Sequence, residues 1–173
     1  MNEAEWLTRK KRIDTRLKQS GWKLLPFSSG LDLTTLDKCA VEELPTGNGP
    51  ADYALFVGGR CLGIVEAKKV TVNPQNVLEQ AKRYARGVFD AVGQWNEFRV
   101  PFLYSSNGTL IWHLDTRPEK LVSRPLSGFH TPDALDARFA HDTAPARTYL
   151  LDTPPEQIDR KAPSLSARLH RRG

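Results

Sequence analysis

The sequence predicts an α/β fold in which helices cover both faces of a central sheet. Two adjacent apolar stretches, Asp52 to Val57 and Cys61 to Ala67, are separated by only three residues, as in a tight hairpin. Amphipathic helical patterns flank this hairpin, over residues 3–20 and from Asn73 to about Ala91. A chain of 173 residues is long enough to bury a core as one domain.

The first predicted element is the helix over residues 3–20. Ile13 and Leu17 lie on one of its faces at helical spacing and predict the buried side. Glu5 and Arg9 are four residues apart, which suits an ion pair along the helix. We therefore expect one amphipathic helix that packs against the sheet.

The two apolar stretches are predicted to be paired strands inside the sheet. Alternate residues of a strand project to opposite faces, and in residues 52–57 both sets are largely apolar. Such a strand belongs in a sheet that is covered on both sides. A short strand is also predicted at Ala40 to Leu44, followed by a dense turn signal over residues 45–50.

A second helix and a second hairpin are predicted in the following segment. The helix opens at Asn73–Pro74, and its core face is formed by Leu78, Ala81, Ala85, Val88 and Val92. The dipeptide Asn107–Gly108 lies between strand-like residues 101–104 and 109–115, which is typical of a hairpin.

The composition changes after residue 116, where seven prolines interrupt a weakly periodic stretch. One further helix is predicted at residues 132–139. We expect a folded domain over residues 1–141, and we expect residues 142–173 to be a linker or tail that is partly disordered.

The composition is that of a water-soluble globular protein. The mean hydropathy is −0.48 and no apolar run approaches the length of a membrane span. The N-terminus lacks the order of a signal peptide, and Cys39 and Cys61 lack metal-ligand spacing, so we expect a cytoplasmic protein with reduced thiols. The net charge of +5 permits a polyanionic partner without proving one.

The candidate chemistry lies on the central hairpin. Glu66 and Lys68 are two residues apart and project from the same face of a strand, and Asp52 starts the neighbouring strand. Magnesium is commonly held by one or two carboxylates with water and substrate phosphate, and it activates water for phosphodiester cleavage. Asp52 and Glu66 can supply the carboxylates, the Ala67 carbonyl a further oxygen, and Lys68 a charge for the developing phosphorane.

A Glu-x-Lys triplet alone is a weak signal, because such triplets also form surface ion pairs. Here Glu66 follows an apolar run and Asp52 precedes a paired strand. The next helix adds Gln80 and Tyr84, four residues apart and predicted to lie off its core face. We therefore favour a metal-dependent nuclease site over surface pairing.

These residues resemble the Q-x-x-x-Y branch of the PD-(D/E)xK nuclease superfamily. More specifically, the chain resembles the N-terminal domain of the restriction (R) subunit of type I restriction enzymes. The matching stretches are Glu5–Arg9 with Ile13–Asp14 and Gly21–Trp22, Gly49–Phe56, Ile64–Lys69, Glu79–Tyr84, Ser106–Gly108 with Trp112, and Phe129–Leu135.

The resemblance implies a restriction-endonuclease-like core with a mixed central sheet flanked by helices. It implies Asp52, Glu66 and the Ala67 carbonyl as ligands of Mg2+, with Mn2+ as an alternative, and Lys68 as catalytic. Gln80 and Tyr84 would support the site or its DNA strand. Glu5 matches the helix carboxylate that the family places near the metal.

The resemblance also implies a function: a site-specific type I deoxyribonuclease that cuts double-stranded DNA together with modification and specificity subunits. In the family an ATP-driven motor follows in the same polypeptide. This sequence has no GxxxxGK[ST] loop, so we expect it not to bind ATP by that route. Two alternatives remain: a silent module of the same fold that docks on DNA or on the complex, and another nuclease of the superfamily.

Basic residues near the proposed site are candidates for DNA phosphate contacts: Lys69, Lys82, Arg83 and Arg86. Solvation at the surface is the alternative for each of them. The four histidines show no ligand spacing, and His113 beside Trp112 is predicted to be structural.

Overall fold

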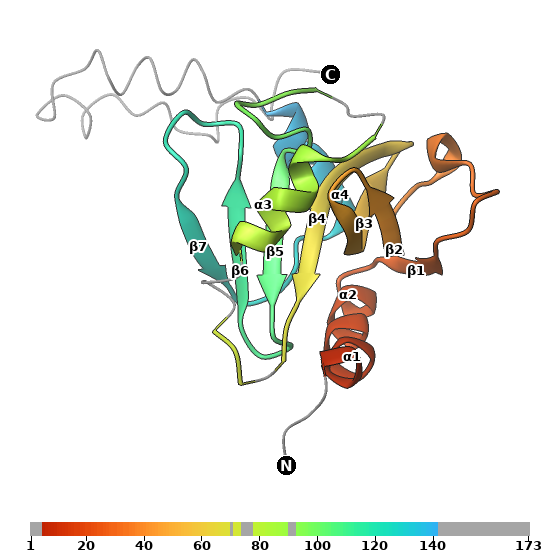
Figure 1. The fold of residues 1–173 in the computed structure, drawn as a ribbon, viewed down its shortest axis with the longest axis vertical. Coiled ribbons are helices and arrows are strands. Elements are labelled where there is room, and N and C mark those ends of the chain that lie inside the picture. Colours follow the sequence, from red (N-terminus) through yellow and green to blue (C-terminus); the bar gives the residue numbers. More distant parts are fainter. Residues whose placement is uncertain (1–4, 70, 74–77, 90–92, 142–173) are drawn as a thin grey trace, which may run out of the picture. The chain divides into compact units, whose positions relative to one another are not determined.

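The computed structural model describes residues 5–69, 71–73, 78–89 and 93–141, and Figure 1 shows their arrangement. The chain divides into two units, residues 1–139 and 140–173, and the fold below is that of the first. The predicted tail, residues 142–173, lies outside the described residues. The boundary at residue 141 therefore stays a prediction.

The core of the fold is a mixed sheet of seven strands in the order β1 to β7. Strands β1 and β2 are parallel, β4 and β5 are parallel, and the other neighbours are antiparallel. The predicted α/β class with a mixed sheet is confirmed. The strands are β1 Lys23–Pro26, β2 Cys39–Thr46, β3 Gly49–Val57, β4 Arg60–Ala67, β5 Phe102–Ser106, β6 Ile111–Asp115 and β7 Ser123–Leu126.

Both hairpins predicted from the sequence are present. Strand β2, which precedes the first of them, is longer than the strand predicted at Ala40 to Leu44. The stretch over residues 45–50, expected to be a turn, instead forms the paired ends of β2 and β3, with Pro45 opposite Pro50. Only Gly47 and Asn48 form the turn. The edge strand β7 was not expected in the proline-rich region. Its Pro125 is tolerated because an edge strand pairs on one side only.

The first helix covers the predicted range but is interrupted by a π turn. It comprises α1 Glu5–Thr8, the π segment Arg9–Ile13 and α2 Asp14–Gln19. Gly21 closes α2 with φ +90°, and the Trp22 amide donates to the Leu17 carbonyl, as a helix-ending glycine favours.

The second helix, α3 Leu78–Arg86, ends before the predicted residue 91. Gly87 lies against the β2–β3 turn, where the Gly47 amide donates to its carbonyl at 2.8 Å. A Cβ on Gly87 would lie 2.9 Å from the Asn48 amide nitrogen, so the chain leaves the helix where two backbones meet. Val88 is buried as expected, but it lies beyond the helix, and Val92 lies outside the described residues.

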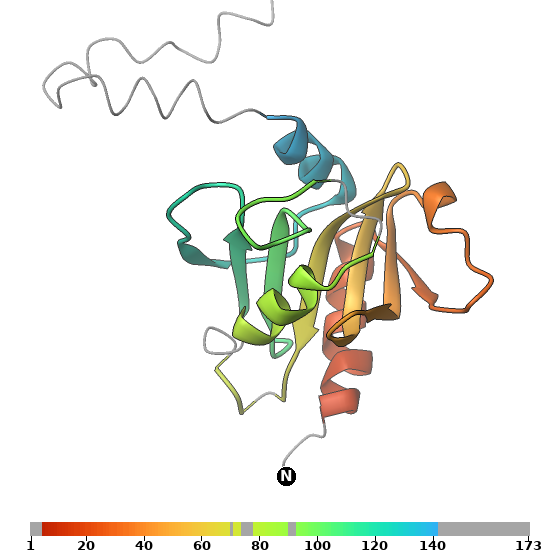
Figure 2. The same cartoon turned by 45° about the horizontal axis from the view of Figure 1, so that its top comes forward.

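Two apolar layers sandwich the sheet. One lies between the sheet and α3, and includes Ala54, Phe56 and Ile64. The other lies between the sheet and the remaining helices, α2 and α4 Pro132–Ala140, through Leu17, Tyr53 and Leu135. Figures 1 and 2 show α3 in front of the sheet, with α2 and α4 behind it. A short 3₁₀ helix, Leu33–Thr35, lies between β1 and β2.

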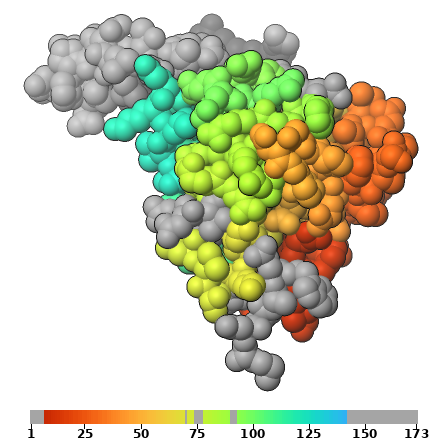
Figure 3. Space-filling model, in the orientation of Figure 1, coloured from red at the N-terminus to blue at the C-terminus, as the bar shows by residue number. Residues whose placement is uncertain are grey.

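The space-filling view in Figure 3 shows α3 covering the middle of one face of the sheet.

Among the described residues, every helix is too short or too polar to cross a bilayer.

Candidate functional site

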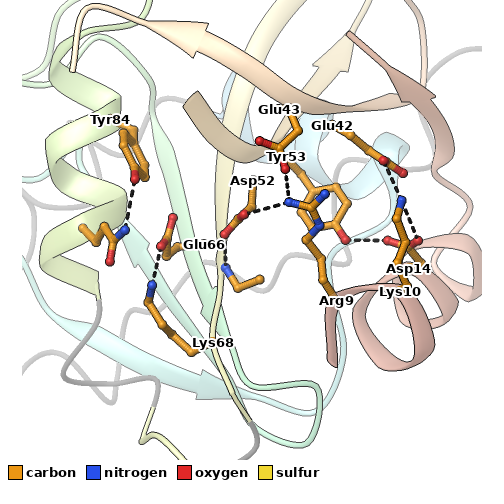
Figure 4. Close-up of polar contacts among 12 residues, drawn as sticks. Arg9, Lys10, Asp14, Glu42, Glu43, Asp52, Tyr53, Glu66, Lys68 and Tyr84 are labelled. Carbon is orange, nitrogen blue, oxygen red and sulfur yellow. Dashed lines mark hydrogen bonds and ion pairs between the residues drawn. The ribbon is translucent and has the colours of Figure 1, made fainter. Parts of the chain in front are cut away.

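The central hairpin brings Asp52, Glu66 and Lys68 together, as the sequence predicts. The register pairs Tyr53 of β3 with Val65 of β4, which places Asp52 beside Glu66 on neighbouring strands. Lys68 directly follows β4, and its amide donates to the Ser106 carbonyl of the adjacent strand β5. Figure 4 shows the three side chains at the same end of the sheet.

Asp52 is a largely buried carboxylate with two donors. Its Oδ2 accepts the Ala67 amide at 2.7 Å, and its Oδ1 accepts the Arg9 guanidinium at 3.0 Å. Burial raises the pKa of Asp52 above its ordinary value, and the Ala67 amide, Arg9 and the charge of Lys68 partly offset this rise. The carboxylate is thus held in one orientation by a backbone group and a cation.

Glu66 and Lys68 form an ion pair, with 2.8 Å between Glu66 Oε1 and Lys68 Nζ. The side chain of Glu66 is 2% exposed and that of Lys68 is 14% exposed. Burying a charge in this way is costly unless it is paired, and the pair adds little net stability. The alternative of a surface ion pair is therefore wrong for Glu66, and its position requires another reason.

Gln80 and Tyr84 contact each other on α3, with 3.0 Å from Gln80 Nε2 to the Tyr84 hydroxyl. The prediction that both residues lie off the core face is wrong for Tyr84. Its ring is buried in the same apolar layer as Leu78, Ala81 and neighbouring core residues. A tyrosine can pack its ring in a core and still present its hydroxyl to polar partners at the edge, which reconciles the two observations.

Three of the four basic candidates for DNA contacts already have partners within the protein. Lys82 pairs with Glu79 at 2.6 Å, and Arg83 stacks over the Tyr84 ring at 5.1 Å.

The Arg86 guanidinium donates to Glu97 at 2.6 Å, and this hydrogen bond raises the pKa of Arg86. Lys69 is exposed. Glu5 begins α1, but its side chain lies outside the described residues, so its predicted place near the metal stays a prediction.

Arg9 is a site residue that the sequence reasoning missed. Its Nη1 donates to both Asp52 and Glu43, and the predicted ion pair with Glu5 stays a prediction because the Glu5 side chain lies outside the described residues. Behind it, Lys10 pairs with Glu42, and the Tyr53 hydroxyl donates to the buried Asp14 carboxylate. No sequence signal joins Arg9 to Asp52, since 43 positions separate them and the contact depends on how the helix docks on the sheet.

The described residues contain no cluster of three or more His, Cys, Asp or Glu side chains that could hold a metal ion. What they offer is two carboxylates on paired strands, each facing a cationic side chain. Magnesium commonly uses one or two protein carboxylates and completes its shell with water and substrate phosphate. The donor set therefore fits a magnesium ion that binds together with DNA.

The predicted structural role of His113 is supported by its contacts on the far side of the sheet from α3. Its Nδ1 donates to the Leu103 carbonyl, and its ring lies 5.0 Å from that of His130. Burial, followed by the charges of His130 and Arg138, lowers the pKa of His113 to about 4. Tyr104 contacts His130 at 2.7 Å and completes this group.

This histidine is expected to make the fold sensitive to acid. The unfolded chain takes up a proton near the ordinary pKa of 6.5 while the folded chain resists it until about 4, so stability falls as the pH drops below 6.5. Urea unfolding at pH 7 and pH 5 is expected to differ by about 2 kcal/mol at 1.36 kcal/mol per pKa unit. His113→Phe should remove most of this difference. An equal pH dependence in the two proteins would contradict the assignment.

Comparison with known proteins identifies the family of this chain. Residues 22–139, more than half of the chain, match the family described as the type I restriction enzyme EcoKI endonuclease subunit second domain. The chain belongs to this family.

Two individual relatives support the assignment. The chain is 27% identical over 190 residues to the type I restriction enzyme EcoKI endonuclease subunit of Escherichia coli K12, covering 82% of this chain and 16% of that subunit. A solved fragment described as an HsdR subunit of a type I restriction enzyme from Vibrio vulnificus YJ016 shares the fold. Its TM-score is 0.56 at 24% identity, over 80% of this chain and 26% of that chain.

Proposed function

We propose that this type I restriction subunit domain is a magnesium-dependent DNA endonuclease domain. The observation that carries the proposal is the Asp52–Glu66–Lys68 group at one end of β3 and β4, with Glu66 almost fully buried. A buried carboxylate that contributes little net stability is more readily explained by metal chemistry than by folding. The E. coli relative is described as an endonuclease subunit, which points to the same activity.

Each residue of the group has a distinct role in the proposed reaction. A divalent cation, with Mn2+ able to replace Mg2+, would polarise the phosphoryl oxygen and lower the pKa of the attacking water. Asp52 and Glu66 would hold it, with the Ala67 carbonyl as the further oxygen. The Ala67 amide fixes the orientation of the Asp52 carboxylate. Lys68 would orient the water or stabilise charge on the phosphorane.

The wider assembly is also part of the proposal. The chain spans 16% of the length of the E. coli subunit it matches, so the activities of the whole subunit extend beyond it. We infer double-stranded DNA as substrate and modification and specificity subunits as partners, in the cytoplasm. ATP would bind elsewhere in the assembly. Membership of the subunit family favours this context over another nuclease of the superfamily.

The structure suggests an order among the basic residues that could contact DNA. Lys69 is exposed, whereas Lys82 and Arg86 would first have to leave Glu79 and Glu97. Gln80 and Tyr84, joined by a hydrogen bond of 3.0 Å, would together support the site or its DNA strand.

Calorimetric titration with Mg2+ and Mn2+, run with a plasmid nicking assay on the same samples, tests the proposal. The 173-residue chain is expected to bind metal and nick DNA, and Glu66→Gln is expected to lose both. Metal binding without nicking, lost in Glu66→Gln, would support the site but assign turnover to the larger assembly. Absence of metal binding would instead favour a silent docking module of the same fold.

A further inference from the structure

Arg9 stands at an unusual point in the first helix. It opens the π segment Arg9–Ile13, in which the Asp14 amide donates to the Arg9 carbonyl five residues back. A π turn has one residue more than an α turn, so Arg9 and Asp14 come closer to the same side of the helix than regular α geometry allows. Both then reach β3, Arg9 at Asp52 and Asp14 at the Tyr53 hydroxyl. Figure 4 shows both contacts.

Glu43 accepts a hydrogen bond from the same guanidinium and lies at a second irregularity of the backbone, in strand β2. It has φ +57° in strand β2, a conformation that side chains other than glycine rarely adopt. The register pairs Glu42 with Tyr53 and Leu44 with Ala51 without a shift, so Glu43 lies opposite Asp52 across the two strands. Strained backbone of this kind concentrates at functional sites.

One nitrogen of Arg9 thus bridges two carboxylates of different exposure. Asp52 is 21% exposed and Glu43 is 52% exposed, while Arg9 is 15% exposed. Burial lowers the pKa of Arg9, but the hydrogen bonds to Glu43 and Asp52 and the charges of Glu43 and Tyr53 together raise it above its ordinary value. A guanidinium is charged in either position. Arg9 can therefore give up Asp52 and remain an ion pair with Glu43.

The net charge of the group around Asp52 determines whether Arg9 has to move when a cation binds. Among the described residues joined by these ion pairs, Asp52, Glu43 and Glu66 carry three negative charges and Arg9 and Lys68 carry two positive charges, which leaves −1. A divalent ion added to this group would bring the sum to +1, with Arg9 directly on a proposed ligand oxygen. Such a contact opposes cation binding unless Arg9 withdraws.

We propose that Arg9 is a positioning residue: it is the counter-ion of Asp52 before metal binds, and it releases Asp52 to a divalent cation while keeping its ion pair with Glu43. This inference rests on the proposed metal site. It makes the first helix part of that site, with Arg9 lowering the affinity for free metal and keeping Asp52 in its binding orientation. Glu43 is the acceptor that makes the exchange favourable.

The test is Mn2+ calorimetry on Arg9→Gln and Glu43→Gln, each with a control one position away. A hydrogen bond between charged groups is worth about a factor of ten in an equilibrium constant, so Arg9→Gln is expected to bind Mn2+ about tenfold tighter than the unsubstituted chain. Lys10→Gln removes the same charge from the same helix and is expected to change affinity less than threefold. Arg9→Lys should remain near the unsubstituted value.

Within the described part of the chain, Glu43→Gln leaves Asp52 as the one carboxylate that pairs with Arg9, and it is expected to weaken Mn2+ binding about tenfold. Glu42→Gln removes the carboxylate that Lys10 holds, and is expected to weaken it less than threefold. The nitrogen signal of the Arg9 guanidinium, followed by NMR, should shift on addition of Mg2+ in the unsubstituted chain and not in Glu66→Gln.

The outcomes separate the two ideas. Metal binding that is lost in Glu66→Gln but unchanged or weakened in Arg9→Gln would overturn the role of Arg9 and leave the nuclease proposal standing. Absence of metal binding in every protein, Arg9→Gln included, would overturn both. Mn2+ binding that is found in Arg9→Gln and in none of the other proteins would support the role of Arg9 as the counter-ion of Asp52.

Discussion

Lys68→Met is expected to reduce DNA nicking by about a hundred- to a thousandfold, the range found when a group that stabilises transition-state charge is removed. The Lys68 ammonium is the cation closest to the proposed ligands, at 2.8 Å from Glu66 Oε1. Metal affinity should be retained or increased, because the substitution removes a positive charge that pairs with Glu66. Nicking rates and Mn2+ calorimetry on the same preparations measure both effects.

Lys69→Met is the matched control for this substitution. Lys69 is the next residue along the chain and is exposed, so its loss removes the same charge outside the paired group. It is expected to weaken DNA binding only a few-fold and to leave the cleavage rate of bound DNA intact. Equal loss of cleavage in both proteins would show that Lys68 acts through general charge and not at the reacting phosphate.

Gly59→Ala is expected to destabilise the fold by about 4 kcal/mol. This cost is the sum of the strain of a positive φ at alanine and the overlap of its Cβ with backbone atoms. Gly59 has φ +72°, and a Cβ there would lie 2.2 Å from the Thr34 carbonyl oxygen. Its amide also donates to the Leu36 carbonyl at 2.7 Å, which fixes the β3–β4 turn to the preceding loop. Urea unfolding followed by circular dichroism measures the loss.

Gly58→Ala is the control within the same turn. Gly58 has φ +54°, but a Cβ there would meet only the Arg60 side chain at 3.8 Å, so a cost of about 1 kcal/mol is expected. The turn matters for the site because a one-residue slip between β3 and β4 would send either Asp52 or Glu66 to the opposite face. Similar costs at the two glycines would contradict the packing described for Gly59.

The sequence predicted best those parts of the structure that depend on residues close together in the chain. The adjacent apolar stretches predicted the β3–β4 hairpin, because strand pairing across a two-glycine turn depends on neighbouring residues. That hairpin fixes which faces Asp52 and Glu66 share, so the centre of the candidate site followed from the sequence. The roles of these residues and of the metal remain proposals.

The sequence predicted least well those features that depend on contacts between segments far apart in the chain. Helix α3 ends at Arg86 because Gly87 meets the β2–β3 turn, and helical periodicity contains no information about that contact. The same holds for Arg9, whose partners Glu43 and Asp52 come from two strands far along the chain. Tyr84 was misplaced because a tyrosine can belong to the core and to the site together.

The most direct test of the central claim is the anomalous diffraction of a crystal of this chain soaked in Mn2+. We expect a peak in contact with one carboxylate oxygen of Asp52 and one of Glu66, with the Arg9 guanidinium released from Asp52 and still paired with Glu43. A saturating soak that yields no peak there, with Arg9 and Lys68 still on the two carboxylates, would contradict the proposal that this hairpin is a metal-dependent nuclease site.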